Sequence, residues 1–162
     1  MASFNIKFFT DIISLERYYK ELSKVYGTYV AVSLHTPLLS NLNIIENIAL
    51  IEEVHQRFNR EKSHKNALKK LQKLNLQELK LKRPSQCSNL QLFSISLIRA
   101  SMMKDVIIVV ITPLVQYQAE DSLEHLYKIL NILDIRERTI ILDLSLYEND
   151  YTDKGIRCNI IK

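Results

Sequence analysis

The chain contains very little glycine: Gly27 and Gly155 are the two glycines among its 162 residues. A loop that cradles phosphate with successive backbone amides normally needs several glycines, because they reach open backbone conformations without strain. The phosphate-loop pattern GxxxxGK[ST] is absent from the sequence. Mechanisms that depend on a glycine-rich loop are therefore excluded.

Cysteine and long apolar runs are also scarce. Cys87 and Cys158 are far apart and lack metal-ligand spacing, and the histidines form no pattern such as HExxH. The first residues lack the features of a signal peptide, and no apolar run reaches the ~18 residues that a spanning helix needs. We therefore expect a cytoplasmic protein with no metal and no cofactor, which reaches the inner face of the cytoplasmic membrane only through a partner.

The net charge of +4 is unevenly distributed along the chain. Between Glu52 and Arg83, ten lysines and arginines occur with four acidic residues, a local surplus of six positive charges. Such a segment is either a solvated helical face or a docking surface for an acidic partner or for anionic lipid headgroups. The only aromatic residue among these charges is Phe58, which argues against base stacking and therefore against nucleic acid.

Strand-like segments alternate with helical ones at both ends of the chain. The run 105–111 is apolar on both faces, which predicts a central strand of a covered sheet. Strands separated by helices predict an α/β fold with a mainly parallel sheet. Four strands are expected at 4–9, 29–34, 105–111 and 139–144, with a short strand or a tail at 155–162.

A helix is expected after the first strand, beginning at Ser14 and ending at Gly27. Its predicted apolar face consists of Leu15, Tyr18, Leu22 and Val25.

The middle of the chain has no strand signal. Helices are expected over 46–58, 63–74 and 88–103, with Pro84 interrupting the chain between the last two. We predict a single domain over 1–162, with an α/β core from about 1–36 and 104–162. The helical subdomain of about 37–103 is inserted between the second and third strands.

Four stretches follow one another in an order that resembles the nucleotide-binding domain of ABC transporters. They are LLSNLNIIENIAL, ALKKLQKLNLQELKLKRPSQCS, CSNLQLFSISLIRA and VIIVVITP, within roughly residues 29–145. The resemblance implies a truncated RecA-like core of the P-loop NTPase type, with a helical subdomain between the Q-loop strand and the Walker B strand. The segment PLVQYQ is similar to the phospholipid-transport (Mce-type) ABC ATPases, and the lipoprotein-release and cell-division ATPases are comparably similar.

The resemblance also locates the catalytic positions, and they carry other residues here. Alignment on Pro113 puts Ile111 at the magnesium-binding Asp and Thr112 at the catalytic Glu, so this is a degenerate Walker B. Leu34 stands at the Q-loop Gln, Ser145 near the switch His and Gln118 near the D-loop Asp. Either residues 10–13 replace the phosphate loop, or the chain starts after that loop; both alternatives remain open at this stage.

The signature segment retains two of its polar residues. Asn89 and Leu90 stand at the two glycines, whereas Ser88 and Gln91 match the family. A Ser-x-x-Gln sequence at a helix start is typical of a capping box, in which the two side chains satisfy backbone amides reciprocally. We therefore interpret Ser88 and Gln91 as a structural cap rather than as a surviving phosphate site.

The four stretches keep the order found in the family, while the catalytic positions carry other residues. This combination predicts a subunit that is not an enzyme. The hypothesis is a pseudo-ATPase that binds a membrane permease, an intact ABC ATPase or both, in a transport complex related to lipids; a homodimer is left open. The resemblance implies a partner groove at His35, Thr36, Pro37, Leu38, Leu39, Asn41 and Asn47. The alternative is a freestanding cytoplasmic adaptor that binds an acidic soluble partner through the basic helical face.

Overall fold

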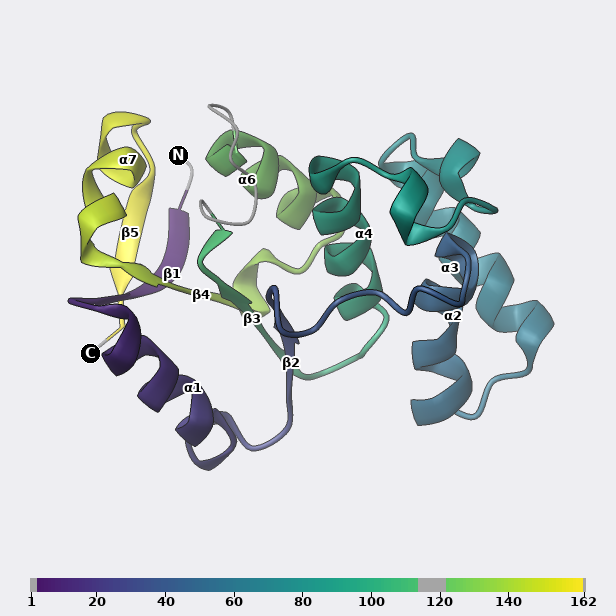
Figure 1. Ribbon diagram of the computed structural model, residues 1–162, viewed down its shortest axis with the longest axis horizontal. Helices are drawn as coiled ribbons and strands as arrows, with labels where there is room; N and C mark the ends of the chain where they lie inside the picture. The colour runs from purple at the N-terminus through teal and green to yellow at the C-terminus, as the bar shows by residue number, and fades with distance from the viewer. Residues whose placement is uncertain (1–2, 114–121, 162) are drawn as a thin grey trace.

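The fold is built on a five-stranded parallel sheet (Figure 1). A computed structural model describes residues 3–113 and 122–161. The strands follow the order β2-β3-β4-β1-β5, and every pairing between neighbours is parallel. This confirms the predicted α/β class. The strands are β1 (Ser3–Phe9), β2 (Tyr29–Val32), β3 (Ile107–Ile111), β4 (Thr139–Leu144) and β5 (Arg157–Ile160).

Helices connect the strands, as a parallel sheet requires. The helices with described bounds are α1 (Ile12–Tyr26), α2 (Ile44–His55), α3 (Arg60–Lys73), α4 (Asn89–Ser101), α6 (Ser122–Ile132) and α7 (Glu148–Asp153). Single 3₁₀ turns occur at Gln77–Leu79, Pro84–Gln86, Arg136–Arg138 and Ser145–Tyr147. Gly27 ends α1 with a φ of 66°, a left-handed conformation that glycine adopts at little cost.

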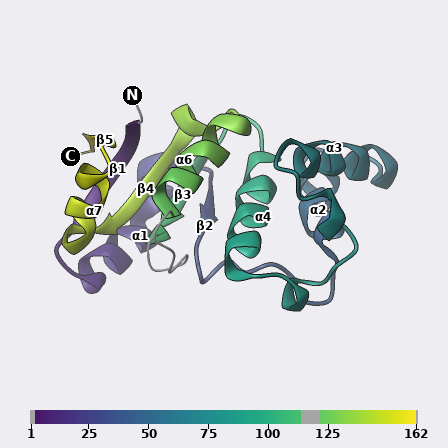
Figure 2. The same ribbon diagram turned by 90° about the horizontal axis from the view of Figure 1, so that it is seen from above.

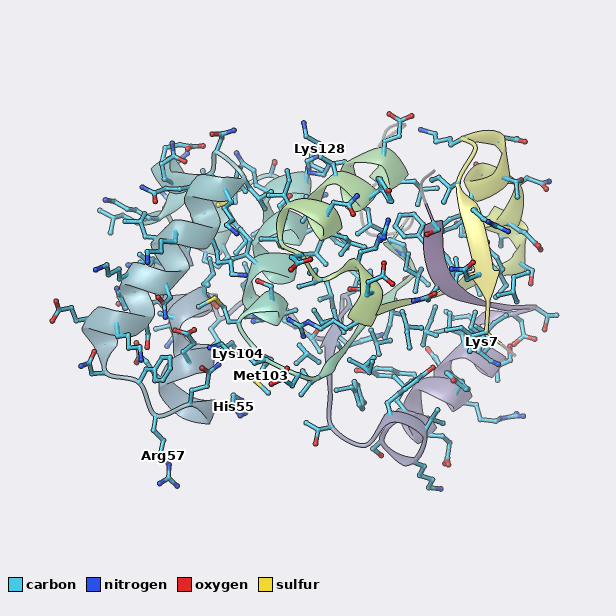
Figure 3. The ribbon with its side chains drawn as sticks, turned by 180° about the vertical axis from the view of Figure 1, so that it is seen from behind. Lys7, His55, Arg57, Met103, Lys104 and Lys128 are labelled. Carbon is cyan, nitrogen blue, oxygen red and sulfur yellow. The ribbon has the colours of Figure 1, made fainter. Side chains whose placement is uncertain are left out.

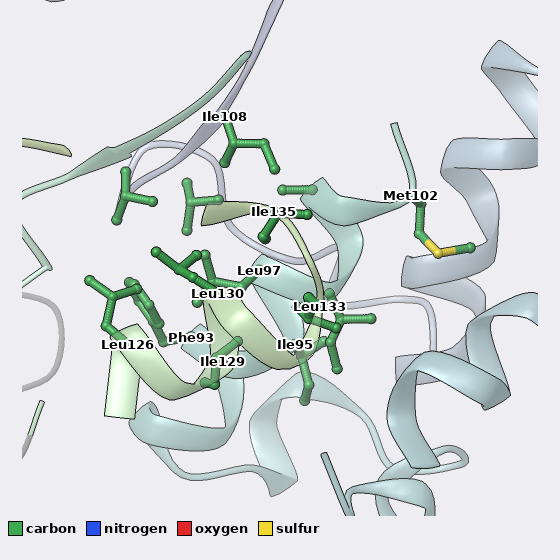
Figure 4. Close-up of a cluster of buried hydrophobic side chains, with 14 of the residues drawn as sticks. Phe93, Ile95, Leu97, Met102, Ile108, Leu126, Ile129, Leu130, Leu133 and Ile135 are labelled. Carbon is green, nitrogen blue, oxygen red and sulfur yellow. The ribbon is translucent and has the colours of Figure 1, made fainter. Parts of the chain in front are cut away.

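The two faces of the sheet are covered by different helices. On one face, Leu15 and Leu22 of α1 are buried against strand residues such as Val109 and Leu142. On the other face, α4 and α6 pack on each other and on the sheet (Figure 4). Their buried side chains in this layer include Phe93, Leu97, Leu126, Leu130 and Leu133.

The helices α2 and α3 lie to one side of the sheet. Figure 2 shows α4 standing between the sheet and this helical pair. The buried residues Ile48 of α2 and Leu71 of α3 belong to the same apolar cluster as Ile108 and Ile141 of the sheet. The inserted helices therefore share a continuous core with the α/β layers.

Two details of the sequence prediction are corrected, and one is confirmed. The first helix begins at Ile12 and is capped by Asp11 rather than by Ser14, because the Asp11 carboxylate accepts from the Ser14 amide. Val25 was expected on the apolar face but is 54% exposed. The interior position predicted for β3 is confirmed, since β3 lies between β2 and β4, and helices on both faces of the sheet explain why its side chains are apolar on both faces.

Candidate functional site

A cavity of about 430 Å³ opens at the carboxyl ends of the strands. This is the edge at which α/β sheets commonly bind ligands. Its walls come from the first turns of α1, from the segment after β2, and from the ends of β3 and β4. Most of the lining is apolar: Ile12, Leu15, Tyr19, Leu34, Ile111 and Leu144.

The link between β1 and α1 consists of Thr10 and Asp11 alone. The Asp11 carboxylate accepts from the Ser14 amide at 2.8 Å and from the Thr10 hydroxyl at 3.1 Å. The hydrogen bond from the Ser14 amide lowers the pKa of Asp11 most, and the one from the Thr10 hydroxyl lowers it further. A helix N-terminus is an anion site by virtue of its unpaired amides and its dipole, and here the chain's own carboxylate fills that role.

The end of β3 has an unusual backbone. Thr112 has a φ of +45°, and its amide donates to the carbonyl of Leu142 at 2.8 Å. A positive φ is a marked outlier for a β-branched residue. Ile111, one residue earlier, is buried with 6% exposure. These two residues stand at the Walker B acids implied by the resemblance, and neither can hold a metal ion as a carboxylate does.

The structure brings a few of the predicted site positions together at this cavity, and the signature segment does not line it. Leu34 and His35, which follow β2, face the same cavity as Ile111 and Thr112, and Leu144 precedes the predicted switch position Ser145. Gln118, at the D-loop position, lies outside the described residues. Sequence positions that are far apart in the chain thus meet at this edge of the sheet.

The charged groups that line the cavity are Glu16 and Lys20. They occur four residues apart on α1, are both exposed and carry opposite charges. Together they leave the cavity without a net charge to balance a polyphosphate. With Asp11 at the helix N-terminus and apolar side chains at the end of β3, these residues do not fit a magnesium-bound nucleoside triphosphate.

The signature segment forms the predicted capping box at the start of α4. The Ser88 hydroxyl accepts from the Gln91 amide at 3.2 Å, and the Gln91 side chain accepts from the Ser88 amide at 2.9 Å. Asn89 and Leu90 form the first turn, and both side chains are exposed. Leu90 and Gln91 also line a smaller cavity of about 170 Å³ between α4 and α6.

The segment predicted as a partner groove contains both surface and interior residues. His35, Pro37, Leu39 and Asn41 are exposed, and Thr36 is half-buried. Two guanidinium nitrogens of Arg99 in α4 hold this segment by donating to the carbonyls of Thr36 at 2.7 Å and Pro37 at 3.1 Å.

Leu38 and Asn47 lie inside the protein instead. Leu38 is 9% exposed and Asn47 is 1% exposed. The Asn47 side chain accepts from the Leu39 amide at 2.7 Å and donates to the carbonyls of Leu39, Leu42 and Asn43. These two residues are therefore not available to a partner, because they fix the conformation of the segment from within.

Sequence reasoning missed a buried acid at the end of β4. Asp143 is 0% exposed, and it accepts from the Tyr151 hydroxyl at 2.7 Å and from the Leu144 amide at 2.9 Å. Burial raises the pKa of Asp143 to about 6 despite these hydrogen bonds. The available signal was a single acid inside the otherwise apolar strand TIILDL.

Comparison with known proteins identifies the fold. No protein-family model and no curated protein matches the sequence. The solved structure of CbiO1 from Clostridium perfringens, part of the ABC transporter complex CbiONQ, superposes with a TM-score of 0.68 at 11% identity. The alignment covers 88% of this chain and 66% of CbiO1.

A second match is the dimeric ATP-binding cassette MJ0796, solved in a post-hydrolysis state with ADP and Pi. It has a TM-score of 0.55 at 21% identity, covering 78% of this chain and 56% of MJ0796. The chain has the RecA-like fold of ABC ATPases. It spans about two thirds of CbiO1 and just over half of MJ0796. Within the described ranges, none of the helices has the length and apolar character needed to cross a membrane.

Proposed function

We propose that this chain is a catalytically inactive ABC-type subunit that binds a membrane permease, an intact ABC ATPase or both in a transport complex. A cytoplasmic location at the membrane, held through the partner, belongs to this proposal. So does a lipid-related substrate for the complex, which rests on the sub-family resemblance of PLVQYQ.

The observation that carries the proposal is the two-residue link before α1. In phosphate-loop proteins a strand, a glycine-rich loop and a helix form the phosphate cradle. Here β1 passes to α1 through Thr10 and Asp11, and the Asp11 carboxylate accepts from the Ser14 amide that an incoming phosphate would need. A phosphate at this helix N-terminus would also meet the negative charge of Asp11.

The apolar cavity supports the same conclusion. Ile111 and Thr112 face a space lined largely by aliphatic side chains. A triphosphate would lose its hydrating water in this cavity. It would not gain the cations and backbone amides that offset that loss in nucleotide-binding sites. Such a lining suits contact with apolar groups better than contact with a nucleotide.

The surface offered to a permease is the segment after β2. In the family that this chain resembles, the groove between the core and the helical subdomain receives a short helix of the permease. The exposed side chains of His35, Pro37 and Leu39 lie in the corresponding segment, which Arg99 anchors to α4. Apolar side chains on a fixed backbone suit recognition of an amphipathic helix.

The first test measures nucleotide hydrolysis. The purified chain, incubated with MgATP, should show no turnover. The variant Asp11→Asn keeps a side-chain cap but removes the charge, and it should likewise show no turnover, because the cradle is still missing. Hydrolysis of ATP that is lost in a Thr112→Ala variant would contradict the proposal.

The second test concerns the partner. A tagged chain purified from its native cells in mild detergent should retain a permease together with an intact ABC ATPase, identified by mass spectrometry. Leu39→Asp should lose both proteins. Val54→Asp is the matched control, since Val54 is an exposed aliphatic residue at 61% exposure on the far part of α2. Equal losses in the two variants would refute the assignment of the docking segment.

A further inference from the structure

A third cavity, of about 490 Å³, lies between the helical subdomain and the base of the sheet. Its walls come from α3, from the segment that joins α4 to β3, and from the turn before β4. Figure 3 shows part of this region from behind, with Lys104 beside the helices α2 and α3. The five basic side chains that line it are Lys69, Lys70, Lys73, Lys104 and Arg138.

This cavity is separate from the cavity of about 430 Å³ beside Thr112. Lys104 precedes β3 and Arg138 precedes β4, so both lie at the amino ends of the strands. The cavity beside Thr112 lies at the carboxyl ends of the same strands. A ligand here would therefore occupy a different edge of the sheet from the nucleotide edge of the fold.

The positive charge of this cavity is only partly balanced. Two carboxylates, Glu52 and Asp134, line it with the five cations, which leaves a surplus of three positive charges. The Glu52 carboxylate already accepts a hydrogen bond from the side-chain amide of Asn66 at 2.8 Å. Among the residues that the structure describes, none of the five cations forms a salt bridge.

The cations also act on one another. Burial lowers the pKa of Lys70, the neighbouring charges of Lys73 and Arg138 lower it further, and Glu52 and Asp134 offset part of that effect. Arg138 is fixed in place, since its guanidinium donates to the carbonyls of Val106 at 2.8 Å and Ser101 at 3.4 Å. Like charges held together in a concave site destabilise the protein by itself, and a bound anion would remove that repulsion.

We propose that this cavity, defined by Lys69, Lys70, Lys73, Lys104 and Arg138, is a binding site for a phosphate group. Flexible lysine ammonium groups and a fixed guanidinium are the side chains that recognise phosphate in proteins. The charges come from three segments of the chain, and they meet around one open, concave space rather than following a single helix. A phosphate-bearing small molecule and a phospholipid headgroup both present this chemistry.

The experiment uses pyrophosphate as the probe. Pyrophosphate should raise the melting temperature of the full chain relative to chloride at equal ionic strength, because a ligand that binds only the folded state stabilises it. Lys70→Glu should weaken the pyrophosphate affinity by about tenfold or more, since it places a like charge beside the anion. The same variant should remain folded without ligand, since the new carboxylate is attracted by Lys73 and Arg138 while it is repelled by Glu52 and Asp134.

The control is Lys65→Glu, which makes the same change of charge at an exposed position of α3 outside the cavity. It should leave the pyrophosphate affinity within about twofold, because solvent screens a distant surface charge. An equal loss in both variants would mean general attraction to a basic helix and would overturn the proposal.

The source of the phosphate group is distinguished with vesicles. Flotation with vesicles of phosphatidylcholine containing phosphatidic acid, if strong and competed by pyrophosphate, identifies a lipid headgroup. Stabilisation by pyrophosphate without flotation identifies a soluble phosphorylated ligand. Absence of both effects refutes the site. The proposal stands or falls independently of the pseudo-ATPase proposal, because Lys70→Glu leaves Asp11, Thr112 and Leu39 unchanged.

Discussion

Thr112 combines two properties that rarely occur in one residue. It stands where the resemblance places a catalytic glutamate, and it has a positive φ that its branched Cβ disfavours. Strained backbone is often found at functional sites, and it persists where the surrounding structure determines it. The amide of Thr112 still donates to the Leu142 carbonyl, which fixes the strand end in that conformation.

Thr112→Asn should therefore stabilise the protein by about 1 kcal/mol, since asparagine adopts the left-handed region more readily than a β-branched residue does. Urea denaturation followed by circular dichroism measures this free energy of unfolding. Thr152→Asn, within the short helix α7, is the control and should give no gain. A loss of stability in Thr112→Asn would show that the threonine side chain is needed there.

Asp143 makes stability depend on pH in the opposite sense to most carboxylates. Its pKa is raised to about 6 in the folded protein, above the ordinary value of 3.8, so the folded state holds the proton more tightly. The stability that this group contributes is present below about pH 4 and is lost as the pH rises through about 6. At neutral pH the buried carboxylate therefore weakens the fold.

Asp143→Asn should remove this penalty and still accept from the Tyr151 hydroxyl. The difference in free energy of unfolding between variant and wild type should grow by about 3 kcal/mol in favour of the variant between pH ~4 and pH ~7.5. Urea titrations of both proteins across that range measure it, and subtraction cancels the other carboxylates. A difference that does not vary with pH would contradict the assignment.

At the scale of single elements, the local signals in the sequence predicted most of the helices and strands. TIILDL predicted β4 with its observed bounds, because an apolar run flanked by charged residues has few alternatives. The sequence favours Ser14 as the cap of α1 although Asp11 is an equally good cap, and only the geometry shows that the Asp11 carboxylate accepts from the Ser14 backbone amide. The residues Asn43 and Glu46 have the spacing of a capping box, but they also belong to the stretch LLSNLNIIENIAL, which is interpreted only through its resemblance to the family.

The candidate site was less predictable. The sequence located Ile111 and Thr112, but the positive φ of Thr112 depends on its pairing with β4 across the sheet. It could not show that Asn47 would turn inward, because asparagines are equally common on surfaces and in turns. The basic cavity joins residues more than sixty positions apart, such as Lys70 and Arg138, and no periodicity in the sequence connects them.

Two substitutions of Ser88 can distinguish its role as the cap of α4 from a role in binding phosphate. Ser88→Ala should cost about 1 kcal/mol in the free energy of unfolding, because the Gln91 amide loses its acceptor. Ser88→Asp should restore nearly all of that stability, since aspartate caps equally well, although its charge would repel phosphate. Failure of aspartate to rescue the thermal stability would argue that the serine serves something other than the cap.

At the scale of the whole molecule, the helical insertion and the sheet share an apolar cluster. Leu71 of α3 is 0% exposed in that cluster, which also includes Ile108 of β3. Elements that share a core in this way are expected to unfold together. The sequence predicted a single domain, and cooperative unfolding is the direct test of that prediction.

Leu71→Ala should lower stability by about 2–5 kcal/mol through the cavity that it leaves. Hydrogen exchange measured by mass spectrometry should show faster global exchange in β3 and β4 as well as in α2 and α3. Leu81→Ala, at a position with 71% exposure, is the control and should change little. Faster exchange confined to the helical subdomain would mean that the two parts unfold separately.

The place of β1 in the sheet has a consequence for biosynthesis. Asn5 pairs with Ile140 on one side and with Asn159 on the other, so an early segment of the chain depends on segments translated much later. Until they emerge from the ribosome, the apolar strand β1 has both edges free and can pair with other nascent chains. A stop codon before β5 would leave one edge permanently open, and such a truncated product should be a substrate for chaperones and proteases.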